Sequence, residues 1–321
     1  MNREFQKRHD HVIETLRLLT AQAHKRGETL VFVGGSALQA ALPKPLRLSI
    51  DLDIAYLGES EELVSTLKPE YAITDNGVSA IFHYYRADKN GVITKIDVTK
   101  AMPPEGAYEV RKITGNGQTF TANIATPEYL LASKLTALSI GTIGRQPDQE
   151  LRFLKDVFDA DALIGLGYAT LRMWGFFEKV CEKENLLRGT TFTPSQVAKE
   201  AVKALLAATP LHSSTTTGAS ALSTFQEYLI DGRARQTTLS PAFIKTAAYL
   251  AAYARDHSKV QETTSSIEKK AASSLTREML LETEKDLISH GADRKLAREL
   301  RITAPRALVY YHWIVVPPAE E

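Results

Sequence analysis

The sequence predicts an α+β protein, with a mixed β-sheet and flanking helices in its first half and a mostly α-helical domain after it. Short runs with the alternating or apolar pattern of strands recur up to about residue 124, separated by Gly, Asn and Pro breakers. From about residue 147 onward, helical spacing of apolar residues replaces them. We therefore expect one domain at 1–146 and a second, helical one at 147–321.

Each element of the first half has a local signal. The expected strands lie at 30–33, 50–57, 78–86, 92–98, 108–113 and 119–124. The expected helices lie at 3–26, 36–42 and 59–68, and a further helix begins where Thr126 can act as N-cap and Pro127 as first helical residue.

The second half contains local sequence signals for the starts and ends of helices. Thr193 to Gln196 reads as a capping box with Pro194 at the first helical position. Residues 212–220, rich in Ser and Thr, are expected to form a loop. The expected helices lie at 148–165, 168–186, 194–208, 219–231, 241–256, 265–288 and 292–300.

Composition bounds the function class. The 321 residues are 44% hydrophobic and 24% charged, as in soluble globular proteins, and the net charge is +1. Cys181 is the single cysteine, which excludes a disulfide framework and a cysteine-rich zinc module. The N-terminus lacks the apolar region of a signal peptide. The sequence also contains no run of about 18 apolar residues, the length that would predict a membrane span. We expect a cytoplasmic protein with no membrane partner.

Asp51 and Asp53 are two residues apart on a predicted strand, so both side chains leave the same face. Two neighbouring carboxylates repel each other unless a cation lies between them. Mg²⁺ or Mn²⁺ takes oxygen ligands, often one or two carboxylates together with substrate phosphates. The pair therefore favours a metal site for phosphoryl chemistry, although a solvated strand face is the commoner meaning of Asp-x-Asp.

Two further segments belong to this pattern. Gly34, Gly35 and Ser36 lie between a strand and a helix, where glycines let the backbone approach a phosphate and the helix N-terminus offers free N–H groups. Asp97 follows in a later apolar strand. Each alone is more often a turn or a surface residue, and it is their order along the chain that indicates a site.

These motifs resemble the DNA polymerase β-type nucleotidyltransferase superfamily, and within it the AbiEii/MenT-like toxins of toxin–antitoxin systems. The matching positions are Gly35, Ser36, the Arg-x-Ser-x-Asp-Leu-Asp-Ile stretch that begins at Arg47, Asp51, Asp53, Asp97, Lys134 and Asp156. The likeness is detailed over residues 28–165. The stretch from Ser36 to Asp51 is longer than usual, and its prolines indicate a loop that holds the extra length.

The resemblance implies a role for each matching residue. Asp51 and Asp53 would bind the metal ions, and Asp97 would be the third ligand and the carboxylate on the side of the acceptor hydroxyl. The nucleotide-binding residues would be Gly35, Ser36, Arg47, Ser49 and Lys134. Asp156 would orient Lys134 by a charge-assisted hydrogen bond. Without the resemblance, the local sequence predicts a surface position for Lys134. Asp159 is expected to be structural, as a partner for a nearby basic group.

The same resemblance implies transfer of a nucleoside monophosphate from an NTP to RNA, at the tRNA 3′ end, and a cognate antitoxin protein as partner. A basic cluster near the C-terminus agrees with RNA contact, although it could equally be paired with the acidic residues just upstream; its members are Arg294, Lys295, Arg298, Arg301 and Arg306. Ser49 would be a regulatory phosphorylation site. Transfer to a small molecule or protein, and an inactive binding module of the same fold, are the alternatives.

Overall fold

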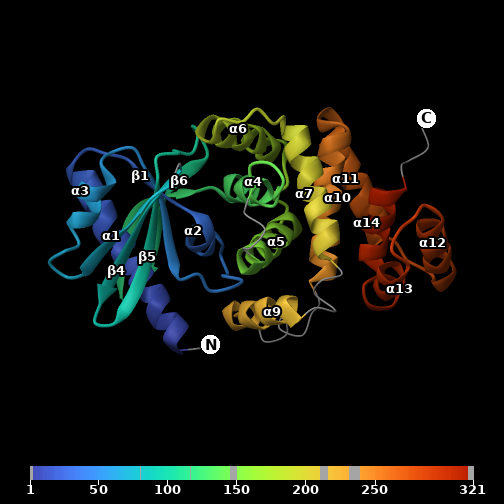
Figure 1. The fold of residues 1–321 in the computed structure, drawn as a ribbon, viewed down its shortest axis with the longest axis horizontal. Helices are drawn as coiled ribbons and strands as arrows, with labels where there is room; N and C mark the ends of the chain where they lie inside the picture. Colours follow the sequence, from blue (N-terminus) through green and yellow to red (C-terminus); the bar gives the residue numbers. More distant parts are fainter. Residues whose placement is uncertain are drawn as a thin grey trace. The chain divides into compact units, whose positions relative to one another are not determined.

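The protein's computed structural model describes residues 3–79, 81–115, 117–144, 150–209, 216–230 and 239–316 (Figure 1). The chain forms two compact units. Unit 1 comprises Met1–Leu130, Leu186–Thr190 and Gln226–Gln236, and unit 2 comprises Leu131–Asn185, Thr191–Phe225 and Thr237–Glu321. The expected domain boundary, between residues 146 and 147, lies outside the described residues.

Unit 1 is built on a mixed sheet. Its strands are β1 (Leu30–Val33), β2 (Asp51–Tyr56), β3 (Ala72–Val78), β4 (Phe82–Lys89), β5 (Val92–Thr99), β6 (Tyr108–Gly115) and β7 (Gln118–Ala125). They lie in the order β3-β4-β5-β2-β1-β7-β6. β2 pairs with β5 and β1 with β7 in parallel, and the other neighbours are antiparallel. This architecture, followed by helices, confirms the predicted α+β class.

Three helices flank this sheet, namely α1 (Arg3–Lys25), α2 (Gly34–Ala41) and α3 (Ser60–Ser65). α1 packs on β5 and on neighbouring strands, and its Leu16 is fully buried. α2 packs on β2 and β7. Between the aspartates of β2, Leu52 and Ile54 are fully buried, so the strand puts its apolar side chains in the core and its aspartates on the other face.

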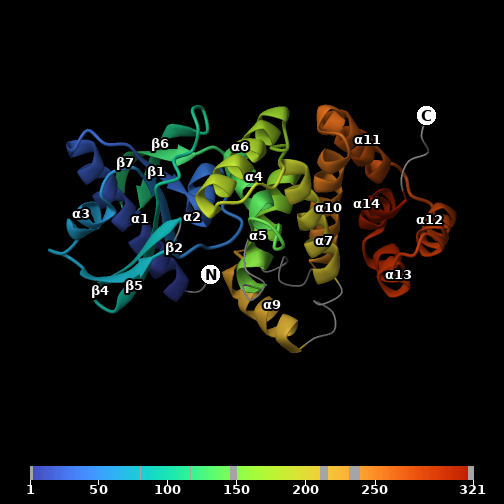
Figure 2. The ribbon, with the colours of Figure 1, turned by 45° about the horizontal axis from the view of Figure 1, so that its top comes forward.

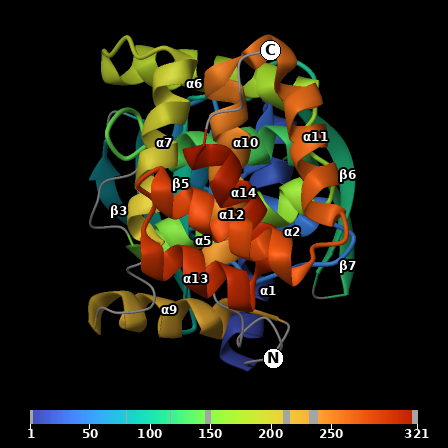
Figure 3. The ribbon, with the colours of Figure 1, turned by 90° about the vertical axis from the view of Figure 1, so that its right-hand side faces the viewer.

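The remaining helices are α4 (Pro127–Ala137), α5 (Glu150–Gly165), α6 (Leu171–Arg188), α7 (Pro194–Ala208), α9 (Thr216–Tyr228), α10 (Ser240–Arg255), the short 3-10 helix η2 (His257–Lys259), α11 (Val260–Ala272), α12 (Arg277–Ser289), α13 (Arg294–Thr303) and α14 (Pro305–Val315). Within unit 2, α10 packs on α5, α7 and α14. α11, α12 and α13 surround α14 (Figures 2 and 3).

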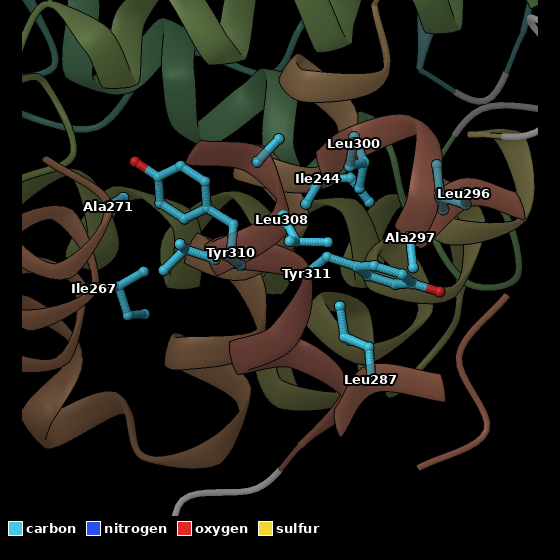
Figure 4. Close-up of a cluster of buried hydrophobic side chains, with 13 residues drawn as sticks. Ile244, Ile267, Ala271, Leu287, Leu296, Ala297, Leu300, Leu308, Tyr310 and Tyr311 are labelled. Atoms are coloured by element: carbon cyan, nitrogen blue, oxygen red, sulfur yellow. The ribbon is translucent and has the colours of Figure 1, made fainter. Parts of the chain in front are cut away.

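The core around α14 is apolar and closely packed. Leu308 and Tyr311 of α14 meet Leu300 of α13 and Leu287 of α12, and Ile244 of α10 joins the same cluster (Figure 4). Leu287, Leu308 and Ile244 are fully buried. Burying a side chain of this size contributes about 1.5–3 kcal/mol before entropy is counted, so the cluster anchors these C-terminal helices.

Four details differ from the sequence prediction. β3 was not expected, because its Asp-Asn-Gly stretch has the composition of a turn; it is an edge strand with a register shift between Asp75 and Val78. α14 was missed too, because it is buried among helices and its apolar run lacks one-sided spacing.

The expected helix 265–288 is two helices, divided where Thr276 caps α12 by accepting from the Met279 N–H. In the expected loop 212–220, residues 212–215 lie outside the described residues and 216–220 belong to α9. Within the described part of the chain, no helix has the length and apolar character needed to cross a membrane.

Candidate functional site

The pairing of β2 with β5 brings the predicted carboxylates to one face of the unit 1 sheet. The two strands are parallel, and Asp53 lies directly opposite Asp97 while Asp51 lies opposite Lys95. Register partners on neighbouring strands are about 4.8 Å apart and project to the same side. Since Asp51 and Asp53 also share a side, all three aspartates occupy one face of adjacent strands.

The carboxylates suit a hard divalent cation, because every donor is an oxygen. Among the residues that the structure describes, no three His, Cys, Asp or Glu side chains are grouped closely enough to form a metal cage. Mg²⁺ sites of phosphoryl transfer commonly use only one or two carboxylates, and the substrate phosphates supply further ligands. The aspartate face fits such a shared site, and the assignment of Asp51, Asp53 and Asp97 as metal ligands stays a prediction.

The position of the Asp53 side chain explains why residue 34 is glycine. Its φ is +72°, in the left-handed region, and a Cβ placed there would lie 2.0 Å from Asp53 Oδ2. A side chain at position 34 would therefore displace this carboxylate. Gly34 therefore makes room for Asp53, and the approach of a phosphate to these glycines stays a prediction.

Gly35 makes room for two other side chains. A Cβ at position 35 would lie 2.8 Å from Arg47 Nη2 and 3.0 Å from Ser49 Oγ. Arg47 and Ser49 are both buried, and Arg47 Nη1 donates to the Leu48 carbonyl at 3.2 Å. The turn that opens α2 thus lies against the segment that leads into β2.

Ser36 has a structural bond in this arrangement. Its side chain is fully buried, and its hydroxyl donates to the Asp51 carbonyl at 2.6 Å. This bond ties the first turn of α2 to the strand that carries Asp51. His9 of α1 is close by, with Nδ1 3.4 Å from the Ser49 carbonyl, and burial lowers the pKa of its imidazole. The predicted contact of Ser36 with nucleotide stays a prediction.

Lys134 lies in unit 2, where it forms a buried ionic cluster with α5. Its Nζ donates to Asp156 Oδ1 at 2.6 Å and is 3.1 Å from Asp159 Oδ2. Each of the two carboxylates is 1% exposed, and the lysine is buried as well. The hydrogen bond expected between Lys134 and Asp156 is present, and Asp159 has the same lysine as its basic partner. A surface position for Lys134 is wrong; its contact with a triphosphate stays a prediction.

The basic residues of α13 divide into two kinds. Arg294, Lys295 and Arg298 are exposed, whereas Arg301 forms an ion pair with Glu284 of α12. The acid-paired alternative therefore describes Arg301. RNA binding by this cluster stays a prediction.

Sequence reasoning missed two polar residues of the aspartate face. Lys95 is exposed and lies opposite Asp51, and Tyr84 of β4 lies opposite Asp97. The signal for Lys95 was available, because it alternates with Asp97 on one strand. No local signal points to Tyr84, because its position depends on which strand pairs with β5.

Comparison with known proteins adds a family. Residues 17–231 match the family described as "Nucleotidyl transferase AbiEii toxin, Type IV TA system". None of the curated proteins compared with the chain matches it. A similar solved structure is an antigenic nucleotidyltransferase-like protein from Paracoccidioides brasiliensis, 12% identical, with 59% of this chain and 92% of that chain covered at a TM-score of 0.35. That likeness is too loose to inform on activity. The family match spans more than half of the chain and includes the positions from Gly34 to Asp156 described above, and the protein therefore belongs to the AbiEii family of nucleotidyltransferase toxins of type IV toxin–antitoxin systems.

Proposed function

We propose that the protein uses a divalent metal, Mg²⁺ or Mn²⁺, to transfer a nucleoside monophosphate from an NTP to the 3′ end of tRNA. The observation that carries the metal-dependent chemistry is the strand register that sets Asp53 opposite Asp97, with Asp51 on the same face. Metal ions bound there would neutralise the charge that develops on the phosphates and align the attacking and leaving oxygens.

The aspartates divide the remaining work. Asp51 and Asp53, at the start of β2, would hold the metal, and Asp97 would accept the proton of the attacking hydroxyl. The new bond joins that hydroxyl oxygen to the α-phosphorus, and the bond from the α-phosphorus to the bridging oxygen of the β-phosphate breaks. Pyrophosphate leaves with that oxygen. The half-buried position of all three carboxylates is compatible with access for a substrate.

The phosphates would be held by the start of α2 and by buried cations. The first turn of α2 would present its backbone N–H groups to an anion, as helix N-termini commonly do. Gly35 borders the Arg47 guanidinium, which would contact phosphate. Lys134 is proposed as a ligand of the triphosphate because its position matches the family's lysine motif. Arg294, Lys295 and Arg298 would contact the RNA backbone.

Ser49 is proposed as the regulatory position. Its hydroxyl faces Gly35 at the start of α2, and a phosphate there would add about −1.5 to −2 charge close to the carboxylates. The added charge would compete with the NTP for the metal and for the same N–H groups. The cognate antitoxin is the partner expected to control this step.

The test is incubation of the protein with labelled NTPs, Mg²⁺ and total tRNA. We expect label at the tRNA 3′ end, and none with Asp51→Asn. Label in protein or in a small molecule would instead support another acceptor, and the absence of any NTP consumption would overturn the metal-dependent transfer itself.

A further inference from the structure

Residues 226–230 lie far along the chain and pair with the segment just before β2. Residues Gln226–Ile230 comprise the last three residues of α9 and the two that follow it, and they belong to unit 1, although the segments on either side of Gln226–Gln236 belong to unit 2. This returning segment lies beside residues 46–48, just before β2, so about 180 residues of chain separate two segments that meet in space.

The contact is made by main-chain hydrogen bonds. The Leu48 N–H donates to the Tyr228 carbonyl at 2.7 Å, the Ile230 N–H donates to the Leu46 carbonyl at 3.5 Å, and Arg47 pairs with Leu229 as an antiparallel bridge. Leu229 is 3% exposed, so a buried side chain anchors the segment. The pairing holds the backbone at Leu48. The residues on either side of Leu48 are Arg47 and Ser49.

Those two residues are the ones that border Gly35. Arg47 Nη2 and Ser49 Oγ lie against the position of a Gly35 Cβ, at 2.8 and 3.0 Å. Holding the Arg47 side chain in one position costs rotamer entropy. The pairing with Leu229 restricts the backbone from which this side chain extends.

The Tyr228 phenol also belongs to this environment. Burial is the main cause that raises its pKa, the negative charge of Asp51 raises it further, and the positive charges of Arg8 and Arg47 oppose the rise. Tyr228 is therefore within electrostatic range of the first aspartate of β2, although the two residues are remote in sequence.

We propose that Gln226–Ile230 is a positioning segment of the nucleotide site: its backbone pairing holds Arg47 and Ser49 against Gly35. This inference rests on the proposed function for its substrate, the triphosphate of an NTP. Tyr228 and Leu229 are positioning residues and take no part in bond making.

The first test measures KM and kcat for the NTP in Leu229→Ala, which removes the buried side chain that anchors the segment. If Arg47 loses one charge-assisted hydrogen bond to phosphate, KM rises roughly 10- to 100-fold, while kcat at saturation changes little. Tyr228→Phe leaves the backbone pairing in place and should keep the wild-type KM. The matched control is Leu67→Ala, which removes another buried leucine of unit 1 away from this segment and should leave KM unchanged.

The second test needs no activity. Amide hydrogen exchange of Leu48 reports directly on its bond to Tyr228, and Leu229→Ala should accelerate it while Leu67→Ala does not. Unchanged Leu48 exchange in Leu229→Ala, or an equal rise in KM in the Leu67 control, would overturn the positioning role. A wild-type protein that consumes no NTP would overturn the proposed function instead, and the exchange measurement would still decide whether the segment holds residues 46–48.

Discussion

Replacing Gly34 by alanine tests whether the α2 turn exists to admit the Asp53 carboxylate. The new Cβ would lie 2.0 Å from Asp53 Oδ2, where ordinary contact between non-bonded atoms requires about 3.5 Å. The carboxylate must therefore move by more than about 1 Å. A misplacement of about 1 Å in a reacting group costs on the order of 10²-fold in rate, which is the loss in kcat/KM that we expect. The left-handed backbone adds about 1–2 kcal/mol of strain.

Gly27→Ala is the matched control. Gly27 has a φ of +69°, almost equal to that of Gly34, but no heavy atom lies within 4 Å of a Cβ there. Both variants should lose similar backbone stability in a thermal unfolding assay, and only Gly34→Ala should lose nucleotide transfer. A folded Gly34→Ala protein with the wild-type kcat/KM would refute the reasoning, and so would an equal loss of activity in the Gly27 control.

Four further outcomes are expected. Asp51→Ala should abolish transfer and leave the thermal unfolding temperature unchanged or slightly higher, because it removes one of several clustered negative charges; a merely unfolded variant would contradict the assignment. Lys134→Met should lower the free energy of unfolding by about 3–5 kcal/mol in urea titrations, because it removes a buried cation that is paired with two carboxylates of α5; a neutral effect would argue against the ion cluster. The hydrogen bond from His312 is the main cause that holds the pKa of Asp286 below 3.8. A carboxyl whose folded pKa is depressed stabilises the protein above its unfolded value, and this contribution is lost as pH falls through the folded pKa. Wild type should therefore be more stable than His312→Ala above pH 3.8, with a difference in urea midpoint that shrinks at lower pH; a difference independent of pH would count against the bond. Co-expression with the product of the neighbouring gene should add a mass of about 80 Da, one phosphoryl group, at Ser49; full activity of Ser49→Asp would remove the regulatory role.

Much of the fold could be predicted because its signals are local. β1 was predicted at its observed bounds, since an apolar run ends at Gly34. α7 was predicted at its observed bounds as well, because it begins with a capping box that has Pro194 at the first helical position. The Thr193 side chain accepts from the Gln196 N–H, and the Gln196 side chain accepts from the Thr193 N–H. Both signals involve residues within a few positions of each other, so no tertiary contact is needed to recognise them.

Only part of the candidate site could be predicted from local sequence patterns. The alternation of Asp51 and Asp53 places both on one face whatever the strand's neighbours are, so the sequence by itself determined that pair. That Asp97 faces Asp53, with Tyr84 beyond it, depends on β2 pairing with β5 and β5 with β4. Strand order is decided by the burial of whole sheet faces and by chain connections, which a local pattern does not contain.

Tertiary structure alone decided the environment of the charged residues and of the glycines. Lys134 is indistinguishable in sequence from a surface lysine, and it is buried because Asp156 and Asp159 of a later helix offset the cost of removing its charge from water. The Gly34 turn could be recognised as a turn, but its partner carboxylate could not. Sequence spacing dictates which side chains share a face, and only the packed chain dictates what that face meets.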